Sequence, residues 1–186
     1  MNLNNLEIEA IKIWSSPQMH QYRYIKDIIS GNYDGSLCSY YKKYVDTLIG
    51  LLDKYEDNTE EKTLYRGDVL ETSNSELNEE EIYQNYLANN PIGKCIELEN
   101  TILSFTLSKD IAVKSYENSD KNKKDITPTI LYILEKRIST FIDISYYSKL
   151  PHEEEVLCNK NIKFKVLNIE IKDNNHLVYY LEECAN

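Results

Sequence analysis

The spacing of apolar residues changes near residue 60, and this change restricts the fold more than any other feature of the sequence. Before it, apolar side chains recur every three or four residues, as at Leu48, Leu51 and Leu52, which predicts helices. After it, short apolar runs rich in β-branched and aromatic residues predict strands. We therefore expect an α+β protein, with a helical part at residues 1–60 and a β-rich core at residues 61–186.

The expected elements follow from these patterns, and the length of 186 residues suits a single domain. Asn78 and Glu81 have the spacing of a capping box, which marks the start of a helix. Helices are expected at residues 6–16, 19–30, 39–56, 78–88 and 109–116. A strand is expected in "KTLYRGDVL", ending at Arg66 and Gly67. Further strands are expected at residues 100–108, 127–136, 140–144, 155–158, 162–171 and 176–183, with the last two forming a hairpin.

Charge and composition exclude several classes of function. The formal net charge of -10 argues against a nucleic-acid partner, because such a surface repels phosphate. No apolar run reaches the roughly 20 residues of a membrane helix, and the N-terminus lacks the pattern of a cleavable leader. The cysteines form no CxxC pair, so we expect no zinc site and, without a leader, reduced thiols: Cys38, Cys95, Cys158 and Cys184.

Arg66 interrupts an apolar run in "LYRG" and is the first candidate site residue. An arginine at a strand end commonly forms a surface ion pair. Alternatively, its guanidinium can hold phosphate oxygens in pairs, and Gly67 beside it allows a ligand to approach the backbone.

A polar strand at "LSFTLSKD" is the second candidate. Because alternate residues of a strand share a face, Ser104, Thr106 and Ser108 are expected to point to the same side. Such a row of hydroxyls fits either a solvent-exposed face or the polar wall of a ligand cleft.

Three glutamates at residues 153–155 precede a run of apolar residues and form the third candidate. The identical triplet at residues 79–81 suits a helix start, where carboxylates complement the dipole, but the second triplet follows Pro151 and enters a strand. Strand alternation would place Glu153 and Glu155 on one face, and burial would raise the pKa of at least one of them. The alternatives are a solvated acidic loop and a carboxylate pair for chemistry at a sugar carbon. His152 beside them has no second histidine at the spacing of a zinc site, so no metal is expected.

Together these three elements resemble the R-S-E class of mono-ADP-ribosyltransferases, which includes arginine-specific bacterial toxins. The order is the same: an arginine on an early strand, a Ser/Thr strand, and a Glu-x-Glu at the head of a later strand. "SKLPHEEEVLCNKNIKFKVLNIE" is similar to the turn-turn (ARTT) loop and following strand of that class, and "FTLSKDIAVKSY" is similar to its Ser-Thr-Ser element. The resemblance covers about residues 60–171 and implies two packed, mainly antiparallel sheets around an NAD cleft, with N-terminal helices.

The resemblance also implies a role for each candidate residue. Arg66 would bind the phosphate and ribose side of NAD, and the backbone of Gly67 would bind the nicotinamide amide. Glu155 would be the catalytic glutamate, and Glu153 would orient the incoming guanidinium. Thr106 and Ser108 would stand at the Ser-x-Ser of the class, fixing the glutamate and the nicotinamide ribose. Ser104 is the alternative for the first of these two roles.

Two departures from the class affect this interpretation. Thr106 replaces the usual first serine, and Leu107 replaces a small polar residue. Leu150 stands where many members carry an aromatic residue that contacts the protein substrate, although Tyr146 and Tyr147 lie a few residues earlier. The second departure bears on the protein acceptor rather than on the reaction with NAD.

The expected function is the transfer of ADP-ribose from NAD to an arginine of a target protein, with NAD as substrate and no metal. The alternatives are an NAD glycohydrolase on the same fold and a non-catalytic binding module. We expect a toxin or effector that leaves its cell without a cleavable leader and acts in the cytoplasm of a target cell, or otherwise a cytoplasmic protein. A delivery or activating protein is a further expected partner; a membrane is not.

Overall fold

The computed structural model describes residues 1–16, 19–32, 38–55, 62–70, 78–98, 102–120, 129–138, 141–158, 162–172 and 176–184. These residues form two compact units. The helical unit comprises Met1–Glu61, Leu98–Ser104 and Ser139–Ile162, and the sheet unit comprises Lys62–Glu97, Phe105–Ile138 and Lys163–Asn186. The expected single domain stays a prediction. The strands within residues 141–158 were expected in the β-rich core, but they belong to the same unit as the N-terminal helices.

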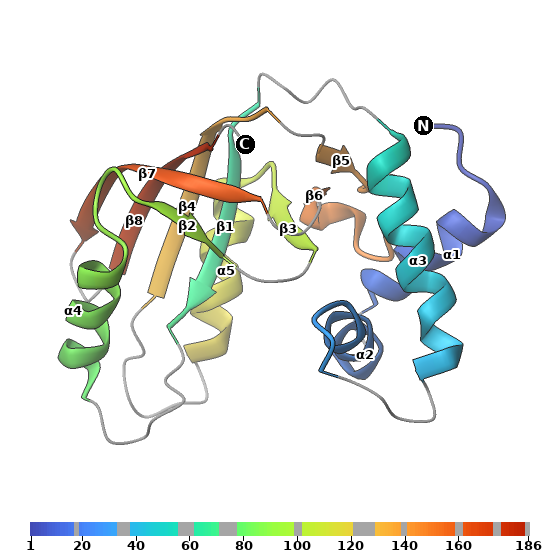
Figure 1. Cartoon of the computed structure of the whole chain (residues 1–186), viewed down its shortest axis with the longest axis horizontal. Helices are drawn as coiled ribbons and strands as arrows, with labels where there is room; N and C mark the ends of the chain where they lie inside the picture. The colour runs from blue at the N-terminus through green and yellow to red at the C-terminus, as the bar shows by residue number, and fades with distance from the viewer. Residues whose placement is uncertain are drawn as a thin grey trace. The chain divides into compact units, whose positions relative to one another are not determined.

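Three helices make up most of the helical unit, as the sequence predicts: α1 (Asn5–Trp14), α2 (Met19–Ile29) and α3 (Cys38–Lys54). Figure 1 shows them in blue to cyan, and both α1 and α2 pack against α3. Each helix contributes apolar side chains to one shared core, in the spacing that predicts an amphipathic helix. The largest fully buried members from these helices are Ile11, Trp14, Ile25, Tyr44, Leu48 and Leu51.

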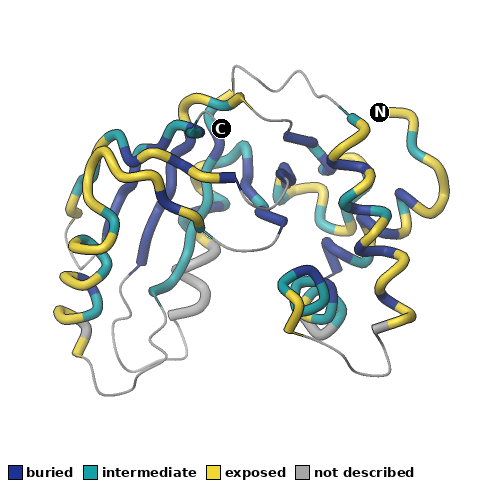
Figure 2. Tube along the Cα trace, viewed as in Figure 1, coloured by how far each residue is buried: buried dark blue, intermediate teal, exposed yellow. Residues whose placement is uncertain are grey.

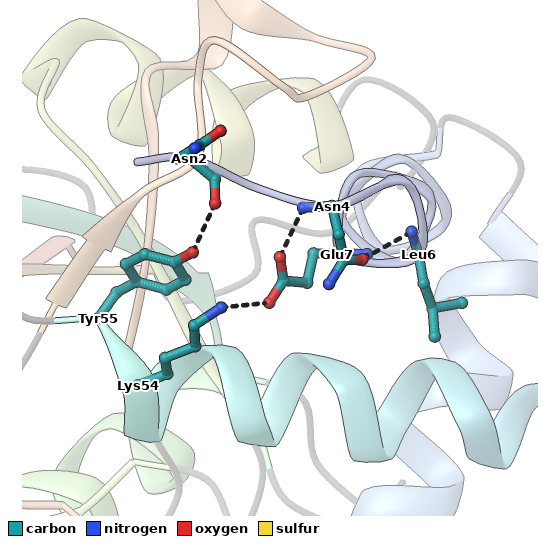
Figure 3. Close-up of polar contacts among 6 residues, drawn as sticks. All are labelled: Asn2, Asn4, Leu6, Glu7, Lys54 and Tyr55. Atoms are coloured by element: carbon teal, nitrogen blue, oxygen red, sulfur yellow. Dashed lines mark hydrogen bonds and ion pairs between the residues drawn. The ribbon is translucent and has the colours of Figure 1, made fainter.

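Helix α1 is fixed at its N-terminus by a capping box that the sequence analysis did not identify. The side chain of Asn4 accepts hydrogen bonds from the backbone N–H of Leu6 and Glu7, and Glu7 accepts one from the backbone N–H of Asn4 (Figure 3). Lys54 of α3 forms an ion pair with the same Glu7 at 3.1 Å. The start of α1 is therefore tied to the end of α3.

Two short strands complete the helical unit, β5 (Phe141–Asp143) and β6 (Glu155–Cys158), which pair antiparallel. Strand β6 is also next to β3 (Leu103–Thr106), whose first two residues belong to this unit. All four residues of β6 are buried, and Ile142 and Leu157 join the core of the three helices. The acidic residue at the head of β6 is therefore carried into an apolar environment.

The sheet unit contains β1 (Leu64–Val69), β2 (Cys95–Glu97), β4 (Thr129–Lys136), β7 (Lys163–Lys172) and β8 (His176–Glu183). These strands lie in the order β2-β7-β8-β4-β1, and β1 pairs with the end of β3 at Thr106. The β4–β8 pair is parallel and the other pairs are antiparallel. The predicted hairpin of the last two strands is confirmed by the β7–β8 pairing, while residues 173–175 of its connection lie outside the described residues.

Two helices cover opposite faces of this sheet. From α5 (Lys109–Asp120), Ala112 and Val113 pack against Leu131 and Ile133 of β4. From α4 (Glu79–Asn89), Tyr86 forms a hydrogen bond through its hydroxyl to that of Tyr132, which alternates with those two residues along β4. The predicted capping box of α4 is present. Strand β4 is thus buried on both sides, as its dark colour in Figure 2 shows.

The expectation of reduced thiols is wrong for two of the four cysteines. Cys95 and Cys184 form a disulfide with a Cα–Cα distance of 6.7 Å. Cys95 lies in the short strand β2, which the sequence analysis missed, and Cys184 follows β8. Both cysteines lie beside the start of β7, since Cys95 is opposite Lys165 and the backbone N–H of Cys184 donates a hydrogen bond to the carbonyl of Lys163. The separation of 89 residues in sequence hides this proximity.

We expect the double variant Cys95→Ser/Cys184→Ser to lose roughly 4 to 5 kcal/mol of unfolding free energy, because the disulfide closes a long loop in the unfolded chain. Denaturant titration of the oxidised protein and of the variant measures the difference. A reductant should bring the wild type to the level of the variant and leave the variant unchanged. Equal midpoints for oxidised protein and variant would contradict the expectation.

Candidate active site

The glutamate triplet is shaped by a tight turn and not by an extended strand. Pro151–Glu153 form the 3-10 helix η1, with proline at its start, where its fixed φ suits a helical turn. Glu154 follows in the left-handed region, with φ 49° and ψ 45°, and Glu155 begins β6. The predicted alternation along a strand therefore does not apply to Glu153. The turn nevertheless brings Glu153 and Glu155 to one pocket and leaves Glu154 exposed.

Glu155 carries a buried carboxylate whose two oxygen atoms differ in their hydrogen-bond partners. The residue is only 8% exposed. Oε1 accepts hydrogen bonds from Trp14 Nε1 at 2.8 Å and from Ser104 Oγ at 2.6 Å. Oε2 is buried and has no hydrogen-bond partner among the described residues. A buried oxygen without a partner costs free energy, so such an atom in a pocket wall is expected to meet a donor from a ligand.

Burial is the main cause that raises the pKa of Glu155 above the ordinary value for a glutamate. The charge of Glu153 acts in the same direction, while the hydrogen bonds from Ser104 and Trp14 favour the ionised form and lower the pKa. Burial also raises the pKa of Glu153, and His152 partly opposes that shift. Perturbed pKa values in a pair of neighbouring carboxylates are typical of functional sites.

The pocket that holds both carboxylates has a volume of about 290 Å³. This is just below the usual range for ligand pockets, about 300 to 1,000 Å³, so the pocket suits a small ligand or one part of a larger one. Its wall combines acidic, hydroxyl and aromatic groups, all from the helical unit: Trp14, Ser15, Ser16, Tyr22, Ser104, Leu150, Glu153 and Glu155. The hydroxyl of Ser15 accepts a hydrogen bond from the backbone N–H of Lys149, which ties α1 to the loop before η1.

The three hydroxyl residues of the second motif are not equivalent. The structure brings Ser104 to Glu155, in the place that the resemblance offered as the alternative register. Strand β3 ends at Thr106, so the predicted row of three hydroxyls on one strand face does not extend to Ser108. Instead, the carbonyl of Ser108 accepts from the N–H of Ala112 at the start of α5, and the N–H of Ser108 donates to Thr106 Oγ1. The start of α5 therefore interrupts the strand before Ser108.

Arg66 lies inside β1 and not at its end, because pairing with β4 continues to Val69 opposite Thr129. Its side chain is 10% exposed, and Nε and Nη2 donate to the two carboxylate oxygens of Asp68 at 2.7 and 3.2 Å. Tyr132, directly opposite Arg66 in the ladder, has its pKa raised mainly by burial, an effect that Arg66 opposes. Gly67 lies next to Arg66 in the same strand, opposite Leu131. Arg66, Gly67, Thr106 and Ser108 belong to the sheet unit, and their geometry is described within that unit alone.

Trp14 is the residue at this site that the sequence analysis missed. It lies within the helix predicted at residues 6–16, where its apolar ring suits the core: it is 1% exposed, with its ring edge-to-face against Tyr22 at 5.0 Å. A buried indole N–H usually has a hydrogen-bond partner, and this is the only tryptophan in the chain. That requirement was the available clue to a polar role.

The site contains no recognisable metal-binding group, since no cluster of three or more His, Cys, Asp or Glu occurs in the described part of the chain. The acidic pocket suits hydroxyl and guanidinium donors. In particular, the unpartnered Oε2 of Glu155 can accept a hydrogen bond from a ligand hydroxyl. None of the described helices combines the length and apolar character needed to cross a bilayer.

Comparison with known proteins gives a likeness in structure but not in sequence. No protein-family model matches the chain, and no curated protein matches it. Among solved structures, the ADP-ribosyltransferase Vis, a toxin from Vibrio splendidus, is 21% identical with a TM-score of 0.70, over 98% of this chain and 75% of that one. The C3 exoenzyme of Clostridium limosum is 15% identical with a TM-score of 0.68, over 99% and 87%. The toxin Plx2a of Paenibacillus larvae is 16% identical with a TM-score of 0.68, over 98% and 88%.

These likenesses extend over nearly the whole chain, including the N-terminal helices. They bear out the α+β class and the fold that the three motifs imply. This chain has the ADP-ribosyltransferase fold, shared with bacterial ADP-ribosylating toxins.

Proposed function

We propose that this protein is an NAD-dependent mono-ADP-ribosyltransferase of the R-S-E class that transfers ADP-ribose to an arginine of a target protein and releases nicotinamide. The observation that carries the proposal is the buried carboxylate of Glu155, held at Oε1 by two donors and unpartnered at Oε2, beside a second carboxylate in one pocket. The fold supports it, since proteins named as ADP-ribosyltransferases share this architecture.

The first chemical step breaks the bond between C1′ of the ribose and the nicotinamide nitrogen. Nicotinamide leaves with the bonding electrons, and positive charge develops on the ribose ring. Oε2 of Glu155 accepts a hydrogen bond from the 2′-hydroxyl, and the buried carboxylate stabilises this charge. The ionised form of Glu155 is required, and its pKa is raised by burial. Nicotinamide release should therefore lose activity on acidification at a higher pH than an ordinary glutamate would give.

The second step transfers the ribose to an acceptor. A guanidinium has a pKa of roughly 12.5 to 13.8 and is a poor nucleophile until it is oriented and loses a proton. Glu153, half-buried in the same pocket, accepts that proton while a guanidinium nitrogen forms the bond to C1′. A related observation supports a guanidinium acceptor: Vis has been crystallised with agmatine, a compound that carries this group.

The remaining candidate residues are proposed to contact NAD or to fix Glu155. Ser104 fixes Glu155, as its 2.6 Å hydrogen bond supports. Arg66 binds the phosphate side of NAD and the backbone of Gly67 the nicotinamide amide, while Thr106 and Ser108 contribute to the ribose side. NAD is the substrate, and the chemistry needs no metal.

Arg66→Ala is expected to weaken NAD binding by about 10- to 100-fold, because a guanidinium bound to phosphate oxygens contributes roughly 1.5 to 3 kcal/mol. Calorimetric titration with NAD measures the loss. Arg137→Ala is the control, since Arg137 of the same unit donates to the carbonyl of Lys62 and is assigned no ligand. Equal affinity of wild type and Arg66→Ala would remove Arg66 from the proposed site.

A toxin or effector that acts in a target cell is the proposed biological role. The disulfide between Cys95 and Cys184 supports passage through an oxidising environment, where such bonds persist. Incubation of target-cell lysate with tagged NAD, followed by mass spectrometry of labelled peptides, would identify the acceptor protein and any need for an activating partner.

Nicotinamide release from NAD by the purified protein tests the proposed function. Release that increases with added agmatine supports transfer to a guanidinium. Release of the same size with and without agmatine would indicate an NAD glycohydrolase. No release, with or without cell lysate, would contradict the proposal and favour a binding module.

A further inference from the structure

Trp14 and Ser104 place two hydrogen-bond donors on the same oxygen atom of Glu155, and they come from distant parts of the chain. Trp14 is the last residue of α1, and Ser104 lies in β3. Their donor atoms are 2.8 and 2.6 Å from Oε1. A carboxylate that receives both donors on one oxygen has a fixed orientation, and its other oxygen is left for a further partner.

The indole is suited to this task in a way that a hydroxyl is not. An indole N–H can only donate and does not ionise, whereas a serine hydroxyl rotates and can also accept. The ring of Trp14 is held by the core of the helical unit and by the ring of Tyr22. The direction of the N–H is therefore determined by packing.

We propose that Trp14 is a positioning residue for the reaction: its indole N–H, together with Ser104, holds Oε1 of Glu155 so that Oε2 receives the 2′-hydroxyl of the nicotinamide ribose. This inference rests on the proposed function, and it assigns to the N-terminal helix a part in the reaction. Trp14 itself acts through Glu155 and transfers no proton.

The contact also affects the charge of Glu155. The hydrogen bond from Trp14 favours the ionised carboxylate and opposes the effect of burial on its pKa. The other groups near this carboxylate are Glu153, whose charge raises the pKa, and Tyr22, which packs on Trp14; His152 acts on Glu153. Loss of the indole N–H should raise the pKa of Glu155 further.

Trp14→Phe tests the contact, because it keeps an aromatic ring in the core and removes the N–H. We expect kcat for nicotinamide release to fall roughly 10-fold with little change in KM for NAD, as for loss of a hydrogen bond to a charged group. We also expect the acid limb of the pH–rate profile to move to higher pH by about one unit. A purely structural role would lower stability and leave that limb in place.

Tyr44→Phe is the matched control. Tyr44 is also buried in the core of the helical unit, and its hydroxyl donates to the carboxylate of Glu9 at 2.9 Å. The variant thus loses one hydrogen bond to a carboxylate in the same core but leaves Glu155 untouched. Its acid limb should coincide with that of the wild type.

Fluorescence provides a test that does not require activity. Trp14 is the only tryptophan, and because its N–H donates to Glu155, we expect its emission to depend on the charge of that carboxyl. Without NAD, the wild type should show an emission change with pH that Glu155→Gln removes and Glu153→Gln retains. If the change persists in Glu155→Gln, or if Trp14→Phe keeps the wild-type kcat and acid limb, the positioning role is overturned. If the wild type releases no nicotinamide, the proposed function fails, and the fluorescence titration still decides whether the contact exists.

Discussion

Glu155→Gln is expected to reduce nicotinamide release from NAD by about 10³-fold, because it replaces the charge that faces the developing positive charge on the ribose. Gln keeps an oxygen that can accept from Trp14 and Ser104, so the pocket should retain its shape. Chromatographic measurement of nicotinamide under single-turnover and steady-state conditions separates this effect from a change in NAD binding. Activity within threefold of wild type would remove Glu155 from the mechanism.

The stability of this variant gives a second, opposite expectation. Because the pKa of Glu155 is raised in the folded state, protonation of Glu155 stabilises the fold. This contribution to the free energy of unfolding is complete below the unfolded-state pKa of about 4.3 and is lost as the pH rises through the folded-state pKa. At neutral pH the ionised, half-satisfied carboxylate therefore lowers the free energy of unfolding. Glu155→Gln removes that penalty, so it should be at least as stable as the wild type at pH 7.

Glu7→Gln is the matched control for a buried carboxylate of the same unit. Its carboxylate receives hydrogen bonds from Asn4 and Lys54, of which the bond from the backbone of Asn4 is the main cause of a lowered pKa. Its stabilising effect is present above the unfolded pKa and lost as the pH falls through the folded pKa. Glu7→Gln should lose about 1 kcal/mol at pH 7 and keep its activity. Glu155→Gln is thus expected to lose activity and keep its stability, and Glu7→Gln to lose stability and keep its activity.

Glu153→Gln is expected to separate the two chemical steps. NAD hydrolysis should continue at a rate near that of wild type, because Glu155 and its two donors are intact. Transfer to agmatine should fall by about 10²-fold, because the guanidinium loses the group that orients it and takes its proton. The ratio of ADP-ribosylated agmatine to free ADP-ribose, measured by mass spectrometry, reports the separation.

Glu154→Gln controls for the loss of one charge in the same triplet. Glu154 is exposed and does not line the pocket, although it lies between the two carboxylates in sequence. Its product ratio should match that of wild type. If Glu153→Gln kept the wild-type ratio, or if both variants lost transfer equally, the role proposed for Glu153 would be wrong.

The fold was predictable where local pattern determines it. The stripes of the first three helices and the cap at Asn78 and Glu81 require only neighbouring residues, and both are present. Strand β2 has three residues and no alternation long enough to recognise. Its disulfide partner lies 89 residues away, so only the strand order could indicate the pairing.

The candidate site was predictable in its residue types but not in its geometry. The triplet at residues 153–155 pointed to a carboxylate pair, and the structure places Glu153 and Glu155 in one pocket. The predicted reason, alternation along a strand, is wrong, because a 3-10 turn and the left-handed conformation of Glu154 replace the expected strand. The donor from Trp14 lies 141 residues from Glu155, and only tertiary packing brings them together. The sequence predicts that the strand ends at Arg66, whereas the pairing of β1 with β4 continues to Val69.

Mass spectrometry of agmatine after incubation with NAD and the purified protein decides whether this protein transfers ADP-ribose to a guanidinium. We expect a product that has gained one ADP-ribosyl group, formed together with nicotinamide, with the wild type and with Glu154→Gln but not with Glu155→Gln. Unmodified agmatine and intact NAD after prolonged incubation with the wild type, or a product formed equally by Glu155→Gln, would contradict this expectation.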